Sequence, residues 1–276
     1  MKLATIHTAD GTQAARLEGD ELVALPAPDV RALLAHPDMA AIAAVDGPRI
    51  AVAEANFAPV VVNPQRIVCV GLNYANHIKE MGRDLPEYPT IFSKYPDALT
   101  GAFDDIPLPP ETEAFDWEVE LAVIVGASGR RLTGADAEAA IAGFATLNDV
   151  TVRDWQYRTK EWTQGKAWEK QTPLGPYLVT PDEVGGTRPA LRVTTKVDGE
   201  IMQDNNTAEL VFDPVRLVEY ISTFTRLQPG DVIATGTPGG VGHARKPPVY
   251  LHPGSVLETE VEGVGAQRNR IVEEQL

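Results

Sequence analysis

Two glutamates stand one residue apart at the start of an apolar run. Glu118 and Glu120 lie within residues 116–121 (DWEVEL), and the apolar run continues to Val125. Alternate side chains of a β-strand point to the same face, so the two carboxylates would lie side by side. Neighbouring carboxylates repel each other unless a proton or a cation lies between them. The pattern therefore indicates either a metal site or a solvated pair on an exposed face.

A third carboxylate, Asp149, follows the strand-like segment 141–148. A side chain that emerges near the end of a strand can serve as a ligand, although a solvated turn carboxylate explains this segment equally well. Three oxygen ligands without a cysteine or a nearby histidine favour Mg²⁺, Mn²⁺ or Ca²⁺ over zinc. Glu118, Glu120 and Asp149 are thus the candidate ligands of a hard divalent cation.

A histidine and a glutamate three residues apart follow the strand-like run 66–71. The sequence there reads as a turn entering a short helix, so His77 and Glu80 share one helical face. A carboxylate held against one imidazole nitrogen fixes the tautomer and raises the basicity of the other nitrogen, as general-base catalysis requires. The same spacing is equally compatible with a pair on the protein surface.

Polar side chains that can bind carboxylate and keto oxygens follow Asp149. They are Arg153, Gln156 and Lys166, each of which taken alone could also be a surface residue. Farther along, the glycine-rich segment 234–242 can bring its backbone close to a ligand. It lacks the Gly-Lys-Ser/Thr ending of a P-loop, so nucleotide binding is not predicted.

A strand-rich framework would have to position these residues. Strand-like runs occupy 66–71, 117–125, 191–197, 231–235 and 256–263, and helical spacing occurs at 74–81, 133–144 and 214–223. Asp213 and Pro214 have the pattern of an N-cap followed by proline at the first helical position. The 22 prolines and 23 glycines imply many turns. We therefore expect an α+β, mainly β fold rather than a doubly wound one.

The first 60 residues differ from the rest of the chain. A turn signal at 9–12 between two strand-like stretches predicts a hairpin, and residues 29–34 and 39–45 have the spacing of short alanine-rich helices. No cluster in this segment suggests chemistry. We predict a small N-terminal α+β domain over residues 1–60 and a catalytic domain over residues 61–276.

Composition narrows the classes of partner. The formal net charge of −15, from 39 acidic and 24 basic residues, argues against nucleic acid and anionic membranes. The single cysteine, Cys69, is expected in the core and excludes an intrachain disulfide and a cysteine-based zinc cluster. The N-terminus lacks a signal-peptide pattern, and no apolar run reaches the ~20 residues of a membrane span. We expect a cytoplasmic protein that acts on a small molecule.

Taken in order, these segments resemble the fumarylacetoacetate hydrolase (FAH) family. The matching stretches are 71–77, 116–121, 148–149 with 153–156, 165–166 before 172–176, 198–200 with 203–207, 229–238 and 262–265. The resemblance implies an FAH-type rolled β-sandwich as the catalytic domain and a homodimer as the assembly. Residues 1–60 resemble the small N-terminal domain that many members carry.

The resemblance also implies roles for particular side chains. Glu118, Glu120 and Asp149 match the family's metal ligands, and His77 and Glu80 match its water-activating pair. Lys166 matches a lysine beside the substrate oxygens. The positions that match substrate contacts are Tyr74, Arg153, Gln156, Lys166 and Thr237. One departure is Glu169, because the third position after the lysine is often aspartate in the family.

The implied activity is metal-dependent hydrolysis of a carbon–carbon bond in a small anionic 1,3-dioxo or 2-oxo carboxylic acid, such as an acylpyruvate or a fumarylpyruvate-like acid. Mg²⁺ or Mn²⁺, or else Ca²⁺, would be the cofactor. The alternatives are decarboxylation of oxaloacetate and isomerisation or hydration of a 2-oxo-dienoate, which pass through an enolate of the same chelated acid. A non-enzymatic alternative is an acidic scaffold in which the carboxylates bind Ca²⁺ for stability alone.

Overall fold

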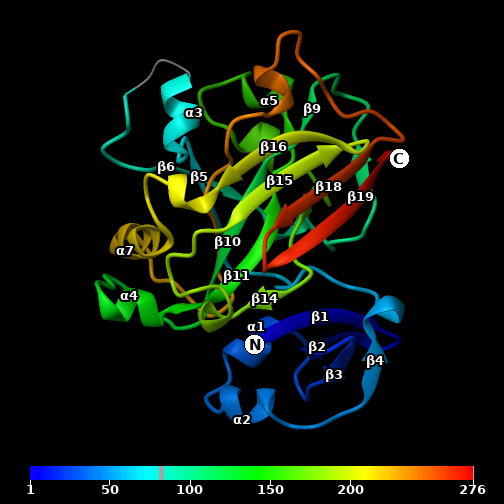
Figure 1. Cartoon of the computed structure of the whole chain (residues 1–276), viewed down its shortest axis with the longest axis vertical. Coiled ribbons are helices and arrows are strands. Elements are labelled where there is room, and N and C mark those ends of the chain that lie inside the picture. The colour runs from blue at the N-terminus through cyan, green and yellow to red at the C-terminus, as the bar shows by residue number, and fades with distance from the viewer. Residues whose placement is uncertain (81–83, 276) are drawn as a thin grey trace.

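Two packed β-sheets make up most of the computed structural model, which describes residues 1–80 and 84–275. Ten strands form one mixed sheet in the order β4-β3-β2-β1-β14-β11-β10-β17-β5-β6, and five form a second sheet in the order β16-β15-β18-β19-β8. Strands β15 and β18 of the second sheet contact β10 and β11 of the first (Figure 1). The fold is therefore α+β and mainly β, as the sequence predicted.

The strands and helices have the following bounds. The ten-stranded sheet contains β1 (Lys2–Thr8), β2 (Gly11–Glu18), β3 (Glu21–Ala24), β4 (Arg49–Ala51), β5 (Ile67–Gly71), β6 (Thr90–Lys94), β10 (Val119–Val125), β11 (Ile141–Asn148), β14 (Leu178–Val179) and β17 (Val232–Ala234). The five-stranded sheet contains β8 (Ile106–Leu108), β15 (Arg192–Val197), β16 (Glu200–Asn206), β18 (Val256–Val261) and β19 (Gly265–Glu273). Two short pairs join β7 (Leu99–Thr100) to β13 (Thr172–Pro173) and β9 (Phe115–Asp116) to β12 (Thr151–Val152). The α-helices are α1 (Val30–Leu34), α2 (Met39–Ala43), α3 (Ala75–Glu80), α4 (Ala135–Ala139), α5 (Arg153–Gln156), α6 (Thr163–Lys166) and α7 (Pro214–Phe224).

Strand β10 lies in the middle of the first sheet and is buried along its whole length. Its odd-numbered residues, such as Leu121 and Val123, pack into a cluster that includes α7. Its even-numbered residues Ala122 and Ile124 pack into a second cluster on the opposite face. A strand covered on both faces favours apolar side chains on both, which explains the uninterrupted apolar run 121–125, whereas Glu120 near the start of the strand is buried and acidic.

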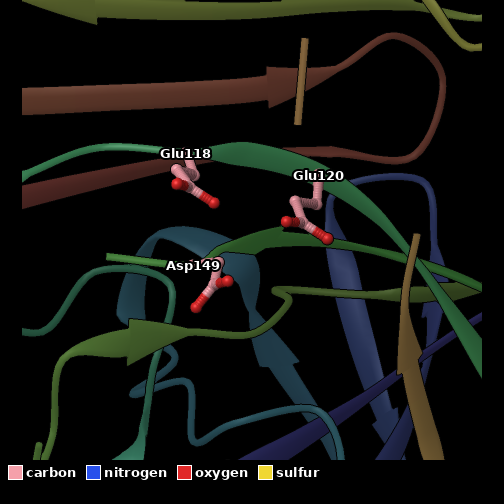
Figure 2. A group of neighbouring side chains, drawn as sticks. All are labelled: Glu118, Glu120 and Asp149. Atoms are coloured by element: carbon pink, nitrogen blue, oxygen red, sulfur yellow. The ribbon is translucent and has the colours of Figure 1, made fainter. Parts of the chain in front are cut away.

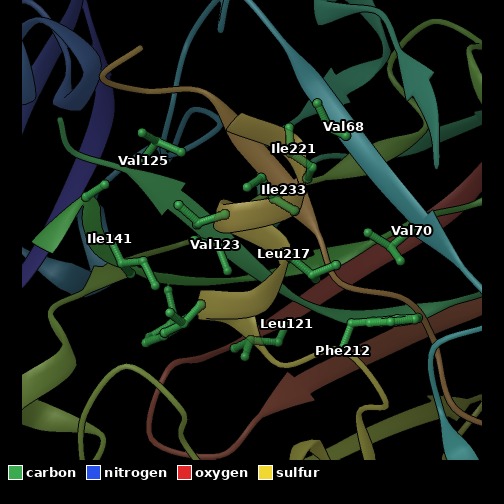
Figure 3. Packing of buried hydrophobic residues seen from close by; sticks show 14 of the residues in the cluster. Val68, Val70, Leu121, Val123, Val125, Ile141, Phe212, Leu217, Ile221 and Ile233 are labelled. Carbon is green, nitrogen blue, oxygen red and sulfur yellow. The ribbon is translucent and has the colours of Figure 1, made fainter. Parts of the chain in front are cut away.

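Helix α7 covers one face of the sheet. Figure 3 shows Leu217 and Ile221 of the helix beside Val123 and Ile233 of the sheet. Full burial of such aliphatic side chains contributes about 1.5–3 kcal/mol each. The predicted N-cap is confirmed, because the Asp213 side chain accepts a hydrogen bond of 2.9 Å from the backbone N–H of Arg216.

The prediction of a helix over residues 133–144 is wrong for the second half of that range. Helix α4 ends at Ala139, and Ile141 already begins β11. Antiparallel pairing with β10, in which Phe144 lies opposite Val123, overrides the local helical spacing. A side chain at Gly143 would come within 2.3 Å of the Val179 backbone oxygen, so the close approach of β14 also requires glycine there.

The N-terminal segment is an extension of the large sheet. Residues 2–18 form the predicted hairpin, and β1 pairs with β14, where Lys2 lies opposite Val179. Figure 1 shows this blue segment below the rest of the molecule, with β1 beside β14. Cys69 is buried, as expected. In the described part of the chain, no helix has the length and apolarity needed to cross a membrane.

Candidate metal centre and substrate cavity

Strand pairing brings the three candidate ligands together. Glu118 immediately precedes β10, and Asp149 immediately follows β11. Val119 lies opposite Asn148 in the antiparallel register, and the Asp149 backbone N–H donates to the Glu118 carbonyl at 2.8 Å. The Asn148 side chain accepts from the Glu118 N–H at 2.9 Å. The residue before β10 and the residue after β11 are thereby held side by side.

The carboxylates of Glu118, Glu120 and Asp149 converge, as Figure 2 shows. One oxygen from each lies within 4.8 Å of the others, and the three residues are 8%, 2% and 0% exposed. The solvated interpretation of the glutamate pair therefore does not hold. A buried group of three carboxylate oxygens at this spacing can hold a divalent cation.

Buried cationic side chains offset part of this negative charge. Lys166 Nζ lies 2.8 Å from Glu118 Oε2 and 2.7 Å from Asp149 Oδ2, and Lys94 Nζ lies 2.5 Å from Asp149 Oδ1. Burial alone would lower the pKa of Lys166, but the Asp149 and Glu118 carboxylates outweigh it and raise the pKa to about 12. Burial opposes ionisation of Asp149, yet Lys166 and Lys94 hold its pKa below the ordinary value. Both groups are therefore charged near neutral pH.

Glu120 has a different environment. It accepts a hydrogen bond of 2.7 Å from the backbone N–H of Gly236, and among the side chains that the structure describes no ammonium or guanidinium lies within ion-pair distance of it. Burial, followed by the charges of Asp149 and Glu118, raises its pKa well above the ordinary value. A buried carboxylate without a cation is the group that a divalent ion would stabilise. The residues present thus fit a metal ion.

Glycine at position 236 makes this contact possible. Gly236 has φ +101°, and a Cβ there would lie 2.9 Å from the Val70 carbonyl oxygen and 3.0 Å from Asn73 Cβ. Only glycine adopts this backbone conformation without strain at so close an approach. The sequence predicts that segment 234–242 brings its backbone close to a ligand, and the structure places the Gly236 backbone N–H against Glu120, a candidate metal ligand.

A cavity of about 380 Å³ opens beside the carboxylates. Its polar lining consists of Glu118, Arg153, Gln156, Tyr157, Lys166, Thr237 and His243, and its apolar lining includes Val70, Leu72, Phe92, Trp162 and Val241. The cavity thus unites four residues expected to contact substrate, which are Arg153, Gln156, Lys166 and Thr237. A volume of this size suits a small acid.

Tyr74, the fifth residue expected to contact substrate, lies elsewhere. It is fully buried in the cluster that includes α7, and it is not among the residues that line the cavity. Its hydroxyl has no hydrogen-bond partner in the described ranges, and its pKa is raised by burial and by the charge of Glu120. An unpaired phenol beside Glu120 is a further polar group that a metal ion or its water could satisfy.

The predicted pair His77 and Glu80 belongs to α3. The side chains of both residues lie outside the described part of the chain, and so do residues 81–83. Their role as a water-activating pair remains a prediction.

Sequence reasoning missed Lys94, Tyr157 and His243. Lys94 ends β6, and the antiparallel pairing of β5 with β6, together with the parallel pairing of β5 with β17, brings it to the site. No local motif marks any of these three residues.

Comparison with known proteins agrees with this geometry. Residues 66–272 match the family model described as the C-terminal domain of fumarylacetoacetate hydrolase. The protein named oxaloacetate tautomerase FAHD2A, mitochondrial, of Bos taurus is 45% identical over 221 residues, which span 79% of this chain and 70% of that protein. The protein of the same name in Homo sapiens is 43% identical over the same fractions of the two chains.

Solved structures extend the similarity to the whole chain. Fumarylacetoacetate hydrolase from Exiguobacterium antarcticum has a TM-score of 0.88 and 32% identity, covering 99% of this chain and 100% of that one. The 5-carboxymethyl-2-hydroxymuconate delta-isomerase from Mycobacterium smegmatis has a TM-score of 0.83 and 30% identity over the same shares. With its buried acidic group and this extent of similarity, the chain belongs to the fumarylacetoacetate hydrolase family.

Proposed function

We propose that this enzyme interconverts the keto and enol forms of a small 2-oxo dicarboxylic acid of the oxaloacetate type, with Mg²⁺ or Mn²⁺ as cofactor. The observation that carries the proposal is the buried group of Glu118, Glu120 and Asp149 beside a small cavity lined by Lys166 and Arg153. The names of the mammalian relatives support this choice over carbon–carbon hydrolysis.

Glu118, Glu120 and Asp149 would hold the divalent ion. When bound, the ion would supply Lewis acidity toward the oxygens of a 2-oxo carboxylate. Ca²⁺ satisfies the same oxygen ligands, so the donor set favours a hard cation without selecting among the three.

The tautomerisation requires a proton to leave carbon 3 and a proton to reach the 2-oxo oxygen. The electron pair of the carbon–hydrogen bond becomes the C2–C3 double bond, and the carbonyl π pair moves to oxygen. Lys166 is a cation near neutral pH and lines the cavity, so its ammonium can donate a hydrogen bond to that oxygen as charge develops. His77, with Glu80 as its predicted partner on α3, is the proton acceptor that the sequence predicts, and the proton that reaches the oxygen would come from solvent.

Hydrolysis of a carbon–carbon bond is the second candidate. The observation in its favour is the three-residue spacing of His77 and Glu80 on α3, which suits activation of water. In that reaction the same base would take its proton from water instead of from carbon 3. The similarity to the fumarylacetoacetate hydrolase of Exiguobacterium antarcticum also supports it.

Parallel assays of oxaloacetate and of an acylpyruvate separate the two candidates. The metal-loaded enzyme should accelerate the loss of enol absorbance of oxaloacetate and leave the acylpyruvate uncleaved. The Glu120→Gln variant should lose the activity together with the metal. A fully loaded protein that cleaves acylpyruvate and leaves oxaloacetate at its spontaneous rate would disprove the proposal in favour of the second candidate.

A further inference from the structure

Arg153 and His243 lie far apart in sequence but line the same cavity. The fully buried carboxylate of Asp116 holds both of them. Asp116 Oδ2 accepts hydrogen bonds from Arg153 Nε at 2.8 Å and from the backbone N–H of His243 at 3.0 Å. Asp116 Oδ1 accepts a further bond of 2.7 Å from the backbone N–H of Gly242. One carboxylate therefore sets the spacing of two cavity groups.

The imidazole ring of His243 is fixed from two sides. Its Nδ1 lies 2.9 Å from the Tyr250 hydroxyl, and its ring lies 5.1 Å from the Tyr157 ring at an interplanar angle of 32°. Partial burial and the charge of Arg153 lower the pKa of His243, with Asp116 acting in the opposite direction. The ring is therefore neutral near neutral pH. If Tyr250 donates to Nδ1, the ring proton resides on Nε2, which has no hydrogen-bond partner among the side chains and backbone that the structure describes.

Arg153 also retains capacity to bind a ligand. Its side chain is buried, and Nη2 lies 2.7 Å from Glu118 Oε1 but makes no well-aligned hydrogen bond in the described part of the chain. A guanidinium N–H that is buried without an aligned acceptor can bind an anionic oxygen at little further desolvation cost. Arg153 thus supplies charge, and His243, in the tautomer with its proton on Nε2, supplies a neutral donor from the exposed rim.

We propose that Arg153 and His243 form a subsite for the second carboxylate of the substrate, the one remote from the 2-oxo group, and that His243 selects dicarboxylic over monocarboxylic 2-oxo acids. The proposal rests on the proposed function for the 2-oxo end of the substrate. A site built to hydrogen-bond a substrate group discriminates against analogues that lack it, because its own polar groups are left unpaired. Asp116 and Tyr250 act as positioning residues for this subsite.

The kinetic test compares oxaloacetate with pyruvate, which lacks the remote carboxylate. The enol absorbance reports on oxaloacetate, and exchange of the methyl protons in D₂O reports on pyruvate. His243→Ala should raise the KM for oxaloacetate roughly 10- to 100-fold, the range expected for a lost hydrogen bond to a charged group, and should leave pyruvate exchange unchanged. His243→Gln keeps an N–H donor and should recover part of the loss.

A matched control is His252→Ala. His252 is an exposed histidine on the same stretch of chain, its Nδ1 lies 3.0 Å from Ser255 Oγ, and it does not line the cavity. Its substitution should change neither the KM for oxaloacetate nor the rate of pyruvate exchange. An equal change for both substrates in His243→Ala, or no change for either, would overturn the subsite.

A binding experiment separates this proposal from the proposed function. Malate and lactate are stable 2-hydroxy acids that differ in the remote carboxylate, and each can be titrated into the Mn²⁺-loaded protein by calorimetry. The wild type should bind malate more tightly than lactate, and His243→Ala should remove most of that difference. If neither oxaloacetate nor pyruvate is enolised but the malate preference depends on His243, the reaction assignment is wrong and the subsite stands. If the preference is absent or survives in His243→Ala, the subsite is wrong.

Discussion

Each oxygen of Asp149 accepts a bond from a different lysine, Lys94 on Oδ1 and Lys166 on Oδ2. Lys94 is enclosed behind the carboxylates, since its side chain is 0% exposed and it also contacts the Val150 carbonyl. Lys166 lines the cavity instead. Two residues of the same type therefore have different expected roles, one in holding Asp149 and one in contacting the substrate.

Substitution of Lys166 by methionine should lower kcat about 10²–10³-fold, because a cation directed at developing negative charge would be lost. The exposed Lys160, six positions earlier on the neighbouring loop, provides the control, and Lys160→Met should retain wild-type turnover. Steady-state rates on oxaloacetate with saturating metal measure the effect, and circular dichroism verifies the fold. Wild-type kcat in a folded Lys166→Met protein would remove Lys166 from the chemistry.

Metal binding should release a proton from Glu120. Its pKa is raised by burial and by Asp149 and Glu118, so in mildly acidic buffer part of the metal-free protein carries a proton there that a cation must displace. Affinity for Mn²⁺ should consequently fall as the pH is lowered. Calorimetric titration in buffers of different ionisation enthalpy counts the released protons.

Two variants complete that measurement. Glu120→Gln should bind Mn²⁺ weakly and without this proton release, whereas Glu260→Gln, at an exposed position of β18, should behave as the wild type does. A binding enthalpy for the wild type that is the same in every buffer would contradict the raised pKa.

Sequence patterns and the family resemblance identified the carboxylates together with Lys166 and Arg153, but they did not identify Lys94 or His243. A Glu-x-Glu at the start of an apolar strand and an aspartate after the next strand are local signals, and β10–β11 pairing makes them one group. Lys94 and His243 depend on which strand lies beside which and on how a loop folds back to Asp116. That information resides in tertiary contacts, so single residues outside a motif could not be assigned.

At the scale of elements, the cap of α7 offers a direct test. Asp213 accepts from the Arg216 N–H at 2.9 Å and Pro214 occupies the first turn. Asp213→Ala should reduce the free energy of unfolding by about 0.5–2 kcal/mol, while turnover stays unchanged because α7 is not part of the cavity lining. Urea denaturation measures the loss.

Asp136→Ala provides the comparison for that cap. Asp136 lies in the first turn of α4, whose N-cap position is Gly134, and it makes no side-chain cap bond. Asp136→Ala should therefore lower the free energy of unfolding by less than Asp213→Ala does. Equal destabilisation by the two substitutions would show that the Asp213 hydrogen bond contributes little.

Helices and strands were predictable where the apolar residues followed a single helical or strand period. Helix α7 and strands β5, β15, β17 and β18 lie where apolar spacing placed them, within two residues at most ends. The boundary between α4 and β11 was not predictable, because alanine-rich helical spacing runs directly into residues whose partner is β10. Pairing with a distant strand decides that boundary.

At the scale of the molecule, the continuous ten-stranded sheet predicts one cooperative unfolding transition. The pairing of β1 with β14 joins residues 1–60 to the rest through backbone hydrogen bonds, and apolar residues of α1 and β10 share one buried cluster. The four tryptophans all lie within positions 117–168, so their fluorescence reports on residues 61–276 and not on residues 1–60.

Far-ultraviolet circular dichroism reports on both parts of the chain. When the protein is unfolded with guanidinium chloride, the midpoint of the circular dichroism change should coincide with the midpoint of the fluorescence change, as two-state unfolding requires. Separate midpoints would show that residues 1–60 unfold independently, in agreement with the division into two domains that the sequence suggested.

The charges around the carboxylate group also impose a sequence of events on the catalytic cycle. Among the side chains that the structure describes around this group, four buried acidic ones face three buried basic ones, and the members are Asp116, Glu118, Glu120, Asp149, Lys94, Arg153 and Lys166. With Glu120 ionised, the surplus among these side chains is one negative charge, which repels a dianionic acid in a poorly screened interior. A divalent ion held by Glu118, Glu120 and Asp149 would reverse the sign of the local potential, so we expect metal to bind before the acid. Initial-rate kinetics should accordingly show compulsory ordered addition, in which no excess of acid substitutes for missing metal.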